Sequence, residues 1–266
     1  MKTPAIILSA LALLGAPLAQ AEVQSKEITY TAGNTEMKGY LAWDDAIDGK
    51  RPGVLVVHEW WGHNDYARER ARQLAALGYV ALAVDMYGDG KTADHPSSAG
   101  EFSKAVMSDM DAARARFKAA MEQLNANEFT DATKTAAIGY CFGGAIVLNM
   151  ARLGVDLDAV VSFHGSLGTQ NPAEEGKVSA RVLVCNGADD KFVSAESIDG
   201  FHQEMNDAGI DYQFESYDGA VHGFTNPGAT ALGEKFSIPL AYNEAADMES
   251  WAAMQKLFAQ VFGKQP

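Results

Sequence analysis

The sequence predicts an α/β domain built on a doubly wound, mainly parallel β-sheet with an antiparallel hairpin at its N-terminal edge. Continuous apolar runs alternate with helical patterns along the chain, as expected of parallel strands that are buried on both faces. The 266 residues are 47% hydrophobic and 21% charged, a globular composition whose length suits one large domain. Because no repeat, low-complexity linker or change of composition divides the chain, residues 22–266 are predicted to form a single domain.

The first 21 residues have the features of a secretory signal peptide. Lys2 precedes a short apolar core over residues 5–14, and Ala19-Gln20-Ala21 matches a small-residue cleavage site. The apolar core is too short to span a bilayer, and no cysteine for a lipid anchor follows the site. Cleavage after Ala21 would leave Glu22–Pro266, for which we expect a periplasmic or secreted location without membrane insertion.

The elements that follow are predicted from hydrophobic periodicity and from turn residues. Alternating apolar and polar residues predict an edge hairpin, and continuous apolar runs predict buried strands with helices between them. Gly78 is expected to end the first helix. The hairpin strands are 27–31 and 37–43, the later strands are 52–58, 79–85, 135–138, 159–163, 181–185 and 211–217, and the helical segments include 65–77, one or two helices within 97–125, 145–150 and 251–262.

The chain is strongly acidic. Acidic residues outnumber basic ones by 35 to 21, so the formal net charge is −14 and the isoelectric point is about 4.8. Nucleic acids and anionic membrane surfaces are bound by basic faces that displace counterions. The sequence therefore predicts neither partner.

The most informative loop follows the predicted strand 135–138, because catalytic groups in such sheets lie beyond the carboxyl ends of the strands. Gly139-Tyr140-Cys141-Phe142-Gly143-Gly144 precedes the apolar helical run 145–150, which is the G-x-C-x-G pattern of a nucleophile elbow. Side chains at the glycine positions would collide with the neighbouring strand and helix. The helix N-terminus would favour a thiolate at Cys141 and later an oxyanion. The alternative is a tight turn without a catalytic role.

A nucleophile elbow needs an acid and then a histidine later in the chain, and both are present. Asp189-Asp190 follows the strand 181–185, and His222 lies among small residues in a polar loop after 211–217. A carboxylate at Asp190 could hold the imidazole of His222 in the tautomer that accepts the thiol proton. Asp189 is the alternative for this role, since either side chain could face the site.

Cys141 and Cys185 are the only two cysteines, and a pair of cysteines in an exported protein can form a disulfide. Cys185 ends the apolar strand 181–185, where a free cysteine is usually a small core residue. Cys141 lies in the elbow motif, which predicts a nucleophile and not a disulfide partner. We therefore favour two free thiols and keep a redox pair as the alternative.

These motifs carry a family resemblance. From about Gly53 to the C-terminal helix, the chain resembles the dienelactone hydrolase family of α/β-hydrolases. The resemblance implies an α/β-hydrolase fold, with Cys141 as nucleophile, His222 as its base and Asp190 as the third member of a triad. It also assigns the oxyanion hole to the backbone N–H groups of Trp60 and Phe142. The matching motifs are Val57-His58-Glu59-Trp60-Trp61-Gly62, Gly139–Gly144, Gly187-x-x-Asp190-x-x-Val193 and His222-Gly223-Phe224.

The same resemblance gives Glu59 a role in catalysis, because the family uses a glutamate in the matching motif to pair with the resting thiol and to help activate it when substrate arrives. A carboxylate that faces the thiol keeps it neutral through like-charge repulsion. A neutral thiol is oxidised less readily, which is useful in an oxidising compartment. The alternative is a structural carboxylate that is paired with His58 or with an arginine.

The chain departs from the family where a substrate carboxylate is bound. Members that act on dienelactone have one arginine after the strand that matches 79–85 and another just past the catalytic histidine, whereas residues 85–90 and 223–228 contain none. Lys91 or Lys191 would offer only a point charge. A mostly apolar pocket for a neutral ester or lactone is therefore expected. Its candidate residues are Trp60, Trp61, Tyr87, Phe142, Phe192 and Phe224, with His164 at a strand end.

The sequence implies neither a metal nor a cofactor. His63, His95 and His202 have no second ligand at a metal-binding spacing, and residues 139–144 lack the lysine and spacing of a phosphate-binding loop. We expect an exported cysteine hydrolase of small, neutral esters or lactones that acts through an acyl thioester. The alternatives are an acyltransferase or small peptidase on the same site, or a non-hydrolytic ligand-binding or thiol-redox protein in which Cys141 and Cys185 cycle.

Overall fold

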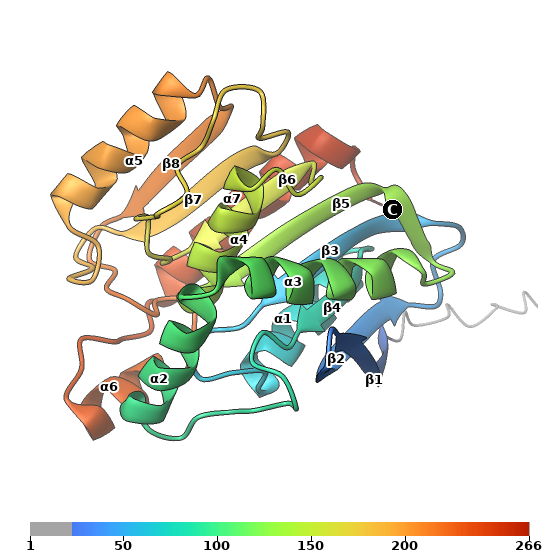
Figure 1. Cartoon of the computed structure of the whole chain (residues 1–266), viewed down its shortest axis with the longest axis horizontal. Coiled ribbons are helices and arrows are strands. Elements are labelled where there is room, and N and C mark those ends of the chain that lie inside the picture. Colours follow the sequence, from blue (N-terminus) through green and yellow to red (C-terminus); the bar gives the residue numbers. More distant parts are fainter. Residues whose placement is uncertain (1–22, 266) are drawn as a thin grey trace, which may run out of the picture.

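The computed structural model describes residues 23–265, so the predicted signal peptide lies outside the described residues. Within that range one eight-stranded sheet has the order β1-β2-β4-β3-β5-β6-β7-β8 (Figure 1). The β1/β2 and β2/β4 pairs are antiparallel and all other pairs are parallel, which confirms the predicted mainly parallel sheet with an antiparallel edge hairpin. The strands are β1 (Val23–Ala32), β2 (Thr35–Asp44), β3 (Arg51–Val57), β4 (Val80–Val84), β5 (Thr130–Tyr140), β6 (Ala159–Phe163), β7 (Arg181–Gly187) and β8 (Tyr212–Tyr217).

Within the described residues, five helices lie in connections between strands, the connection from β6 to β7 has no helix, and two helices follow β8. Two separate helices occupy the region predicted as one or two helices, because Ser108 ends the first and Asp109 caps the second. No helix in residues 23–265 has the length and apolar character that a membrane span requires. The helices are α1 (Asp65–Ala76), α2 (Pro96–Met107), α3 (Met110–Asn125), α4 (Phe142–Arg152), α5 (Ala195–Asp207), α6 (Ala229–Phe236) and α7 (Glu244–Phe262).

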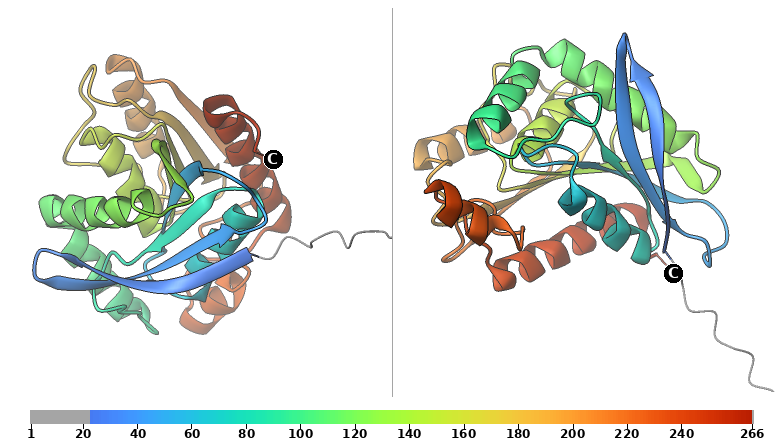
Figure 2. Two further views of the ribbon diagram at one scale, coloured as in Figure 1. Left: turned by 90° about the vertical axis from the view of Figure 1, so that its right-hand side faces the viewer. Right: turned by 90° about the horizontal axis from the view of Figure 1, so that it is seen from below.

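Helices cover both faces of the sheet and bury a separate apolar core on each. α1 and α7 lie on one face and α3 on the other, as the view from below in Figure 2 shows. Along β3, Val54 and Val56 face the α1 side, whereas Leu55 and Val57 face the α3 and α4 side. This alternation within a continuous apolar run is the pattern of a strand that is buried on both faces.

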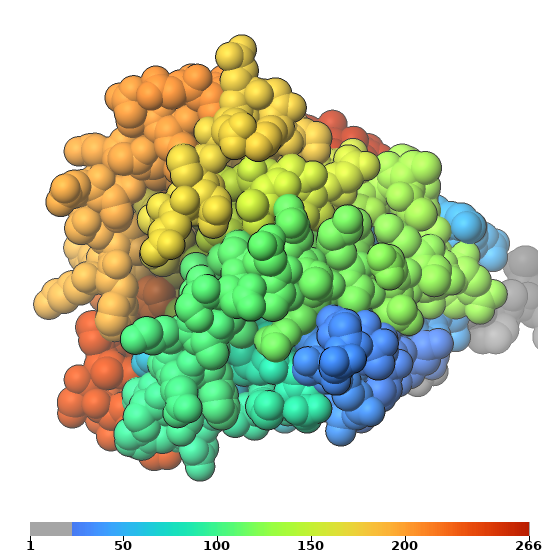
Figure 3. Space-filling model, in the orientation of Figure 1, coloured from blue at the N-terminus to red at the C-terminus, as the bar shows by residue number. Residues whose placement is uncertain are grey.

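Four of the parallel strands bring the candidate site residues to one edge of the sheet. The loops that follow β3, β5, β7 and β8 carry Glu59, Cys141, Asp190 and His222. The carboxyl ends of parallel strands meet at the same edge, so residues far apart in sequence converge there. In the space-filling view, α2 and α3 (green) lie between the N-terminal hairpin (blue) and the region of α5 (orange) (Figure 3).

Two glycines allow the elbow to pack against the sheet. A Cβ added to Gly139 would lie 2.1 Å from the carbonyl oxygen of Gly143, and one added to Gly143 would lie 2.3 Å from that of Val57. Backbone atoms cannot move aside as a flexible side chain can, so β3, β5 and the start of α4 fit together only without these side chains.

We expect Gly143→Ala to lower the free energy of unfolding by about 3 kcal/mol or more, because the new methyl group overpacks a backbone contact. Gly100→Ala is the matched control, since a Cβ at Gly100 in α2 meets nothing within 4 Å. It should raise the free energy of unfolding by about 0.5–1 kcal/mol, because alanine favours the helix. Urea unfolding measures both, and equal effects of the two substitutions would contradict the packing argument.

Candidate active site

Cys141 occupies the sharp turn between β5 and α4. Its backbone has φ 55° and ψ −114°, in a region that residues other than glycine rarely adopt. The N–H of Cys141 donates to the carbonyl oxygen of Phe163 at 3.0 Å and to Nδ1 of His164 at 3.1 Å. The segment therefore has the strand, strained turn and helix of a nucleophile elbow.

The side chains of Cys141, His222 and Asp190 form a connected row. Sγ of Cys141 lies 3.1 Å from Nε2 of His222, and Nδ1 of His222 lies 2.8 Å from Oδ2 of Asp190. Asp190 is buried, whereas its neighbour Asp189 is exposed. Of the two acids that the sequence left open, the structure thus brings Asp190 to the histidine.

The surroundings of His222 favour its protonated form. Burial alone would lower the pKa of His222, but a thiolate at Cys141 and the hydrogen bond to Asp190 together raise it to about 10. An imidazolium is therefore stable between the sulfur and the carboxylate. The row can hold a thiolate, which is the reactive form of cysteine.

Glu59 is buried beside this row but has a different partner from the predicted one. Its Oε2 accepts a hydrogen bond of 2.6 Å from the side-chain amide of Asn226, and no hydrogen bond of the described residues joins it to the thiol. Burial raises the pKa of Glu59 to about 7, although the Asn226 amide and the charges of His222 and Arg70 lower it. Contrary to the expected pairing, Sγ of Cys141 is hydrogen-bonded to His222, and the carboxylate of Glu59 is hydrogen-bonded to Asn226.

The loop that carries Glu59 and Trp60 is fixed by His58. Nδ1–H of His58 donates to the main-chain oxygen of Glu59 at 2.6 Å, and Nε2 accepts from the N–H of Met86 at 3.2 Å. Burial lowers the pKa of His58 to about 4, so the ring is neutral. His58 therefore holds the backbone of Glu59 and forms no ion pair with its carboxylate.

The two N–H groups expected to form the oxyanion hole are those of Trp60 and Phe142. Phe142 is the first residue of α4, whose N-terminus carries partial positive charge. Within residues 23–265, neither amide donates a hydrogen bond to another protein group. Such N–H groups could stabilise a negatively charged oxygen, so the oxyanion hole stays a prediction.

A cavity of about 330 Å³ opens at Cys141 and His222 and is mostly apolar. Phe192, which is 55% exposed, lies at the cavity with its ring centroid 4.9 Å from that of His222. No lysine or arginine is among the lining residues: Lys91 pairs with Asp89, and Lys191 is exposed and does not line the cavity. The lining residues are Trp60, Ser103, Met107, Cys141, Phe142, Ala145, Ser166, Phe192, His222 and Leu240.

Four residues expected in the pocket lie behind its walls instead. Trp61 is buried against Trp60 and Phe236, and the Tyr87 hydroxyl donates to the main-chain oxygen of Trp60 at 2.9 Å. Phe224 and His164 are fully buried and pack against each other. Large aromatic side chains gain most from complete burial, so these residues support the site without lining it.

Other wall residues gave no recognisable signal in the sequence. Ser103 and Met107 come from α2, Ala145 from α4, and Ser166 and Leu240 from irregular segments. Small and aliphatic residues of this kind occur throughout any α/β domain, and only the path of the chain places them at the cavity. Asn226, the partner of Glu59, was missed for the same reason.

Cys185 lies apart from the site. Both cysteines are free, and burial raises the pKa of the Cys185 thiol. Cys185 belongs to the core on the α1 and α7 side of the sheet, whereas Cys141 packs against the core on the opposite side. Within residues 23–265, no group of three or more His, Cys, Asp or Glu side chains is arranged to hold a metal ion.

Comparison with known proteins places this geometry in a family. The model of the dienelactone hydrolase family matches residues 37–262. "Protein usf" of Aquifex pyrophilus is 31% identical over 75% of this chain and 86% of its own length. A Salmonella typhimurium protein provisionally named carboxymethylenebutenolidase is 28% identical over 97% of each chain.

A solved structure agrees with these matches. The crystal structure of a dienelactone hydrolase-like promiscuous phosphotriesterase from metagenomic libraries is 40% identical, with a TM-score of 0.85 over 92% of this chain and 100% of that one. The fold, the site geometry and these similarities agree, and the chain belongs to the dienelactone hydrolase family of α/β-hydrolases.

Proposed function

We propose that the protein is an exported cysteine hydrolase of small, neutral carboxylic esters or lactones. The observation that carries the proposal is the row from Sγ of Cys141 through His222 to Asp190, with distances of 3.1 and 2.8 Å, beside a mostly apolar cavity. Family membership supports hydrolysis of an ester or lactone bond. The predicted leader sequence supports export.

The proposed reaction has two halves, acylation of Cys141 and hydrolysis of the acyl thioester, and each passes through a tetrahedral adduct. The proton of the Cys141 thiol passes to Nε2 of His222, and the sulfur forms a bond with the carbonyl carbon. The carbonyl oxygen takes up the negative charge and accepts hydrogen bonds from the N–H groups of Trp60 and Phe142. The bond to the leaving oxygen then breaks as His222 returns the proton to it, which leaves an acyl thioester.

The second half repeats these steps with water. His222 takes a proton from a water molecule, whose oxygen attacks the thioester carbon. Collapse of this second adduct breaks the carbon–sulfur bond and releases the carboxylic acid, and His222 returns its proton to the departing sulfur, which regenerates the Cys141 thiol. Asp190 keeps its negative charge throughout and holds the orientation and tautomer of His222.

The substrate class follows from the walls of the cavity. Trp60, Met107, Phe142 and Leu240 offer apolar contacts, and the only titratable groups on the lining are Cys141 and His222. The formal net charge of −14 further disfavours anions. A neutral acyl group of modest size suits this cavity better than a carboxylate does.

Of the alternative functions, an acyltransferase or peptidase is compatible with the site, whereas a thiol-redox protein is disfavoured. An acyltransferase or a small peptidase would use the same row of residues, with an amine or alcohol in place of water or with an amide as substrate. A redox cycle between Cys141 and Cys185 is disfavoured, because the two thiols belong to cores on opposite faces of the sheet.

We expect Cys141→Ala and His222→Ala each to lower kcat/KM for p-nitrophenyl acetate by at least about a thousandfold, because each removes a reacting group. Asp190→Asn should cost less, since Asp190 orients the histidine and does not react. Asp189→Asn is the matched control and should leave the rate unchanged. Circular dichroism checks that each variant folds, and a damaging Asp189→Asn beside a silent Asp190→Asn would refute the proposed acid.

Substrate charge gives a second test. Neutral aryl esters should have kcat/KM values at least about tenfold above those of carboxylate-bearing esters of equal size, because no lysine or arginine of residues 23–265 lines the cavity to compensate the acidic field. Steady-state kinetics on matched ester pairs at low and at physiological salt measures the ratio. A carboxylate-bearing lactone that is preferred tenfold or more would show that a cationic subsite exists.

Glu59 gives a third test, which depends on pH. With a pKa of about 7, Glu59 is mostly neutral at pH 6 and mostly charged at pH 8. If the charged carboxylate opposes thiolate formation, Glu59→Gln should speed iodoacetamide alkylation of Cys141 severalfold at pH 8 and change it little at pH 6. Mass spectrometry follows the reaction.

Two results would overturn this role for Glu59. Equal alkylation rates of the two proteins at both pH values would leave Glu59 as a structural carboxyl bound to Asn226. Slower alkylation of Glu59→Gln at pH 8 would mean that the carboxylate chiefly stabilises the His222 cation.

A further inference from the structure

His164 lies directly beneath the candidate site although it does not line the cavity. It follows β6, is fully buried, and has φ 40°, a left-handed conformation that is costly for a residue other than glycine. Such conformations persist where the surroundings hold them firmly, often near functional sites.

The ring of His164 has one tautomer that fits its partners. Its Nδ1 accepts the hydrogen bond of 3.1 Å from the N–H of Cys141, so Nδ1 cannot carry a proton. Nε2 lies 2.8 Å from Oγ1 of Thr225 and therefore donates its N–H to that oxygen. A protonated or reversed ring would place an N–H against the N–H of Cys141. His164 is thus a neutral acceptor with a defined direction.

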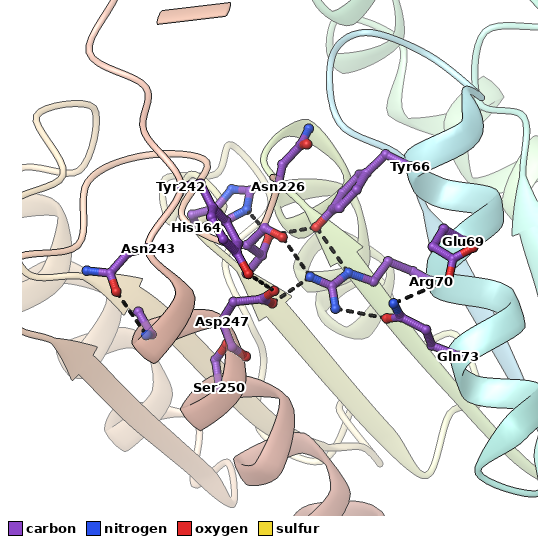
Figure 4. Close-up of polar contacts among 12 residues, drawn as sticks. Tyr66, Glu69, Arg70, Gln73, His164, Asn226, Tyr242, Asn243, Asp247 and Ser250 are labelled. Carbon is purple, nitrogen blue, oxygen red and sulfur yellow. Dashed lines mark hydrogen bonds and ion pairs between the residues drawn. The ribbon is translucent and has the colours of Figure 1, made fainter. Parts of the chain in front are cut away.

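Thr225 is in turn anchored to α1. Its Oγ1 lies 2.7 Å from the hydroxyl of Tyr66, and its carbonyl oxygen accepts from Nη2 of Arg70 at 2.6 Å. Arg70 also pairs with Asp247 of α7, which Figure 4 shows together with Tyr66 and His164. An arginine can only donate, so the network ends in a fixed donor that orients the groups before it.

His164 also contacts the candidate base. The ring centroids of His164 and His222 lie 5.2 Å apart at an interplanar angle of 65°. Burial, together with the charges of His222 and Arg70, lowers the pKa of His164 well below its usual value. The ring therefore stays uncharged beside His222 and does not oppose its protonation.

We propose that His164 is a positioning residue for the reaction, which holds the main-chain N–H of Cys141 and so directs Sγ toward His222, with Thr225 fixing its tautomer. The inference rests on the proposed function, because it assigns to His164 the alignment of that nucleophile and base. His164 itself exchanges no proton in the reaction. Its contribution is a hydrogen-bond acceptor, Nδ1, whose position stays fixed while charge is transferred between Cys141, His222 and the substrate.

The test removes the hydroxyl that fixes the tautomer and keeps the shape of the side chain. In Thr225→Val, Nε2–H of His164 loses its acceptor, so kcat for p-nitrophenyl acetate should fall about tenfold while KM changes less than about twofold. Iodoacetamide alkylation of Cys141 at pH 6 should slow severalfold. Thr225→Ser restores the hydroxyl and should restore both rates.

A matched control shows whether the effect of Thr225→Val comes from this position or from any substitution of a buried threonine by valine. Thr130 is also fully buried, and its hydroxyl has no hydrogen-bond partner within the described residues. Thr130→Val should therefore leave kcat and the alkylation rate unchanged. If Thr225→Val lowers only the unfolding temperature and both rates stay at the wild-type level, His164 is a structural residue and the proposal is wrong.

A second pair covers the case in which Thr225→Val does not fold. Asparagine tolerates a left-handed backbone and can place an acceptor where Nδ1 of His164 lies, whereas leucine has a similar size and no acceptor. His164→Asn should stay within about threefold of the wild-type alkylation rate, and His164→Leu should fall about tenfold. Equal rates for the two variants would overturn the proposal.

Alkylation needs no turnover, which separates the two hypotheses. Persistent ester hydrolysis by Cys141→Ala would refute the proposed function and leave the alkylation comparison valid. Wild-type alkylation of both Thr225→Val and His164→Leu would refute the role of His164 and leave the proposed hydrolase intact.

Discussion

The left-handed backbone of Cys141 is the constraint on which the rest of the site depends. It turns the chain from β5 into α4 within one residue and raises the sulfur above the edge of the sheet. The turn fits only because Gly139 and Gly143 let three segments of backbone approach one another. Two acceptors, the carbonyl oxygen of Phe163 and Nδ1 of His164, then hold the strained residue in place.

The histidines around the elbow are all buried, and their neighbouring groups decide which of them is charged and which are neutral. His222 lies between a sulfur and the carboxylate of Asp190 and is favoured as a cation. Among the described residues, no carboxylate is hydrogen-bonded to His58 or to His164, so burial keeps both neutral and each acts as a fixed donor and acceptor. Three buried histidines in one site therefore have different tasks, set by the groups that surround them.

Reactive groups and cavity walls come from different parts of the fold. The reactive groups follow strands, whose ends are fixed by hydrogen bonds to their neighbours in the sheet. Much of the wall comes from α2 and from irregular segments that contribute Ser103, Met107, Ser166 and Leu240. Substrate preference can therefore change through these wall residues while the elbow and the histidine stay in place.

The sequence by itself determined the sheet, the elbow and the order of nucleophile, acid and histidine. Strands buried on both faces require continuous apolar runs, and the turn at Cys141 requires glycines, so both leave local patterns. These patterns predicted the edge hairpin, and they placed Cys141 and His222 correctly at the ends of β5 and β8. The strand predicted at 135–138 is too short: β5 begins at Thr130, because its first residues pair with Arg51 and Pro52 and carry no apolar run.

Only the tertiary structure decided between neighbouring acids, chose the partner of Glu59, and showed which aromatic residues line the cavity. Asp189 and Asp190 have the same chemistry, and the direction of a loop buries one and exposes the other. Asn226 contacts Glu59 across 167 residues of chain, and His164 reaches Cys141 from the next strand. Such contacts depend on how distant segments pack, and no local pattern of residues encodes them.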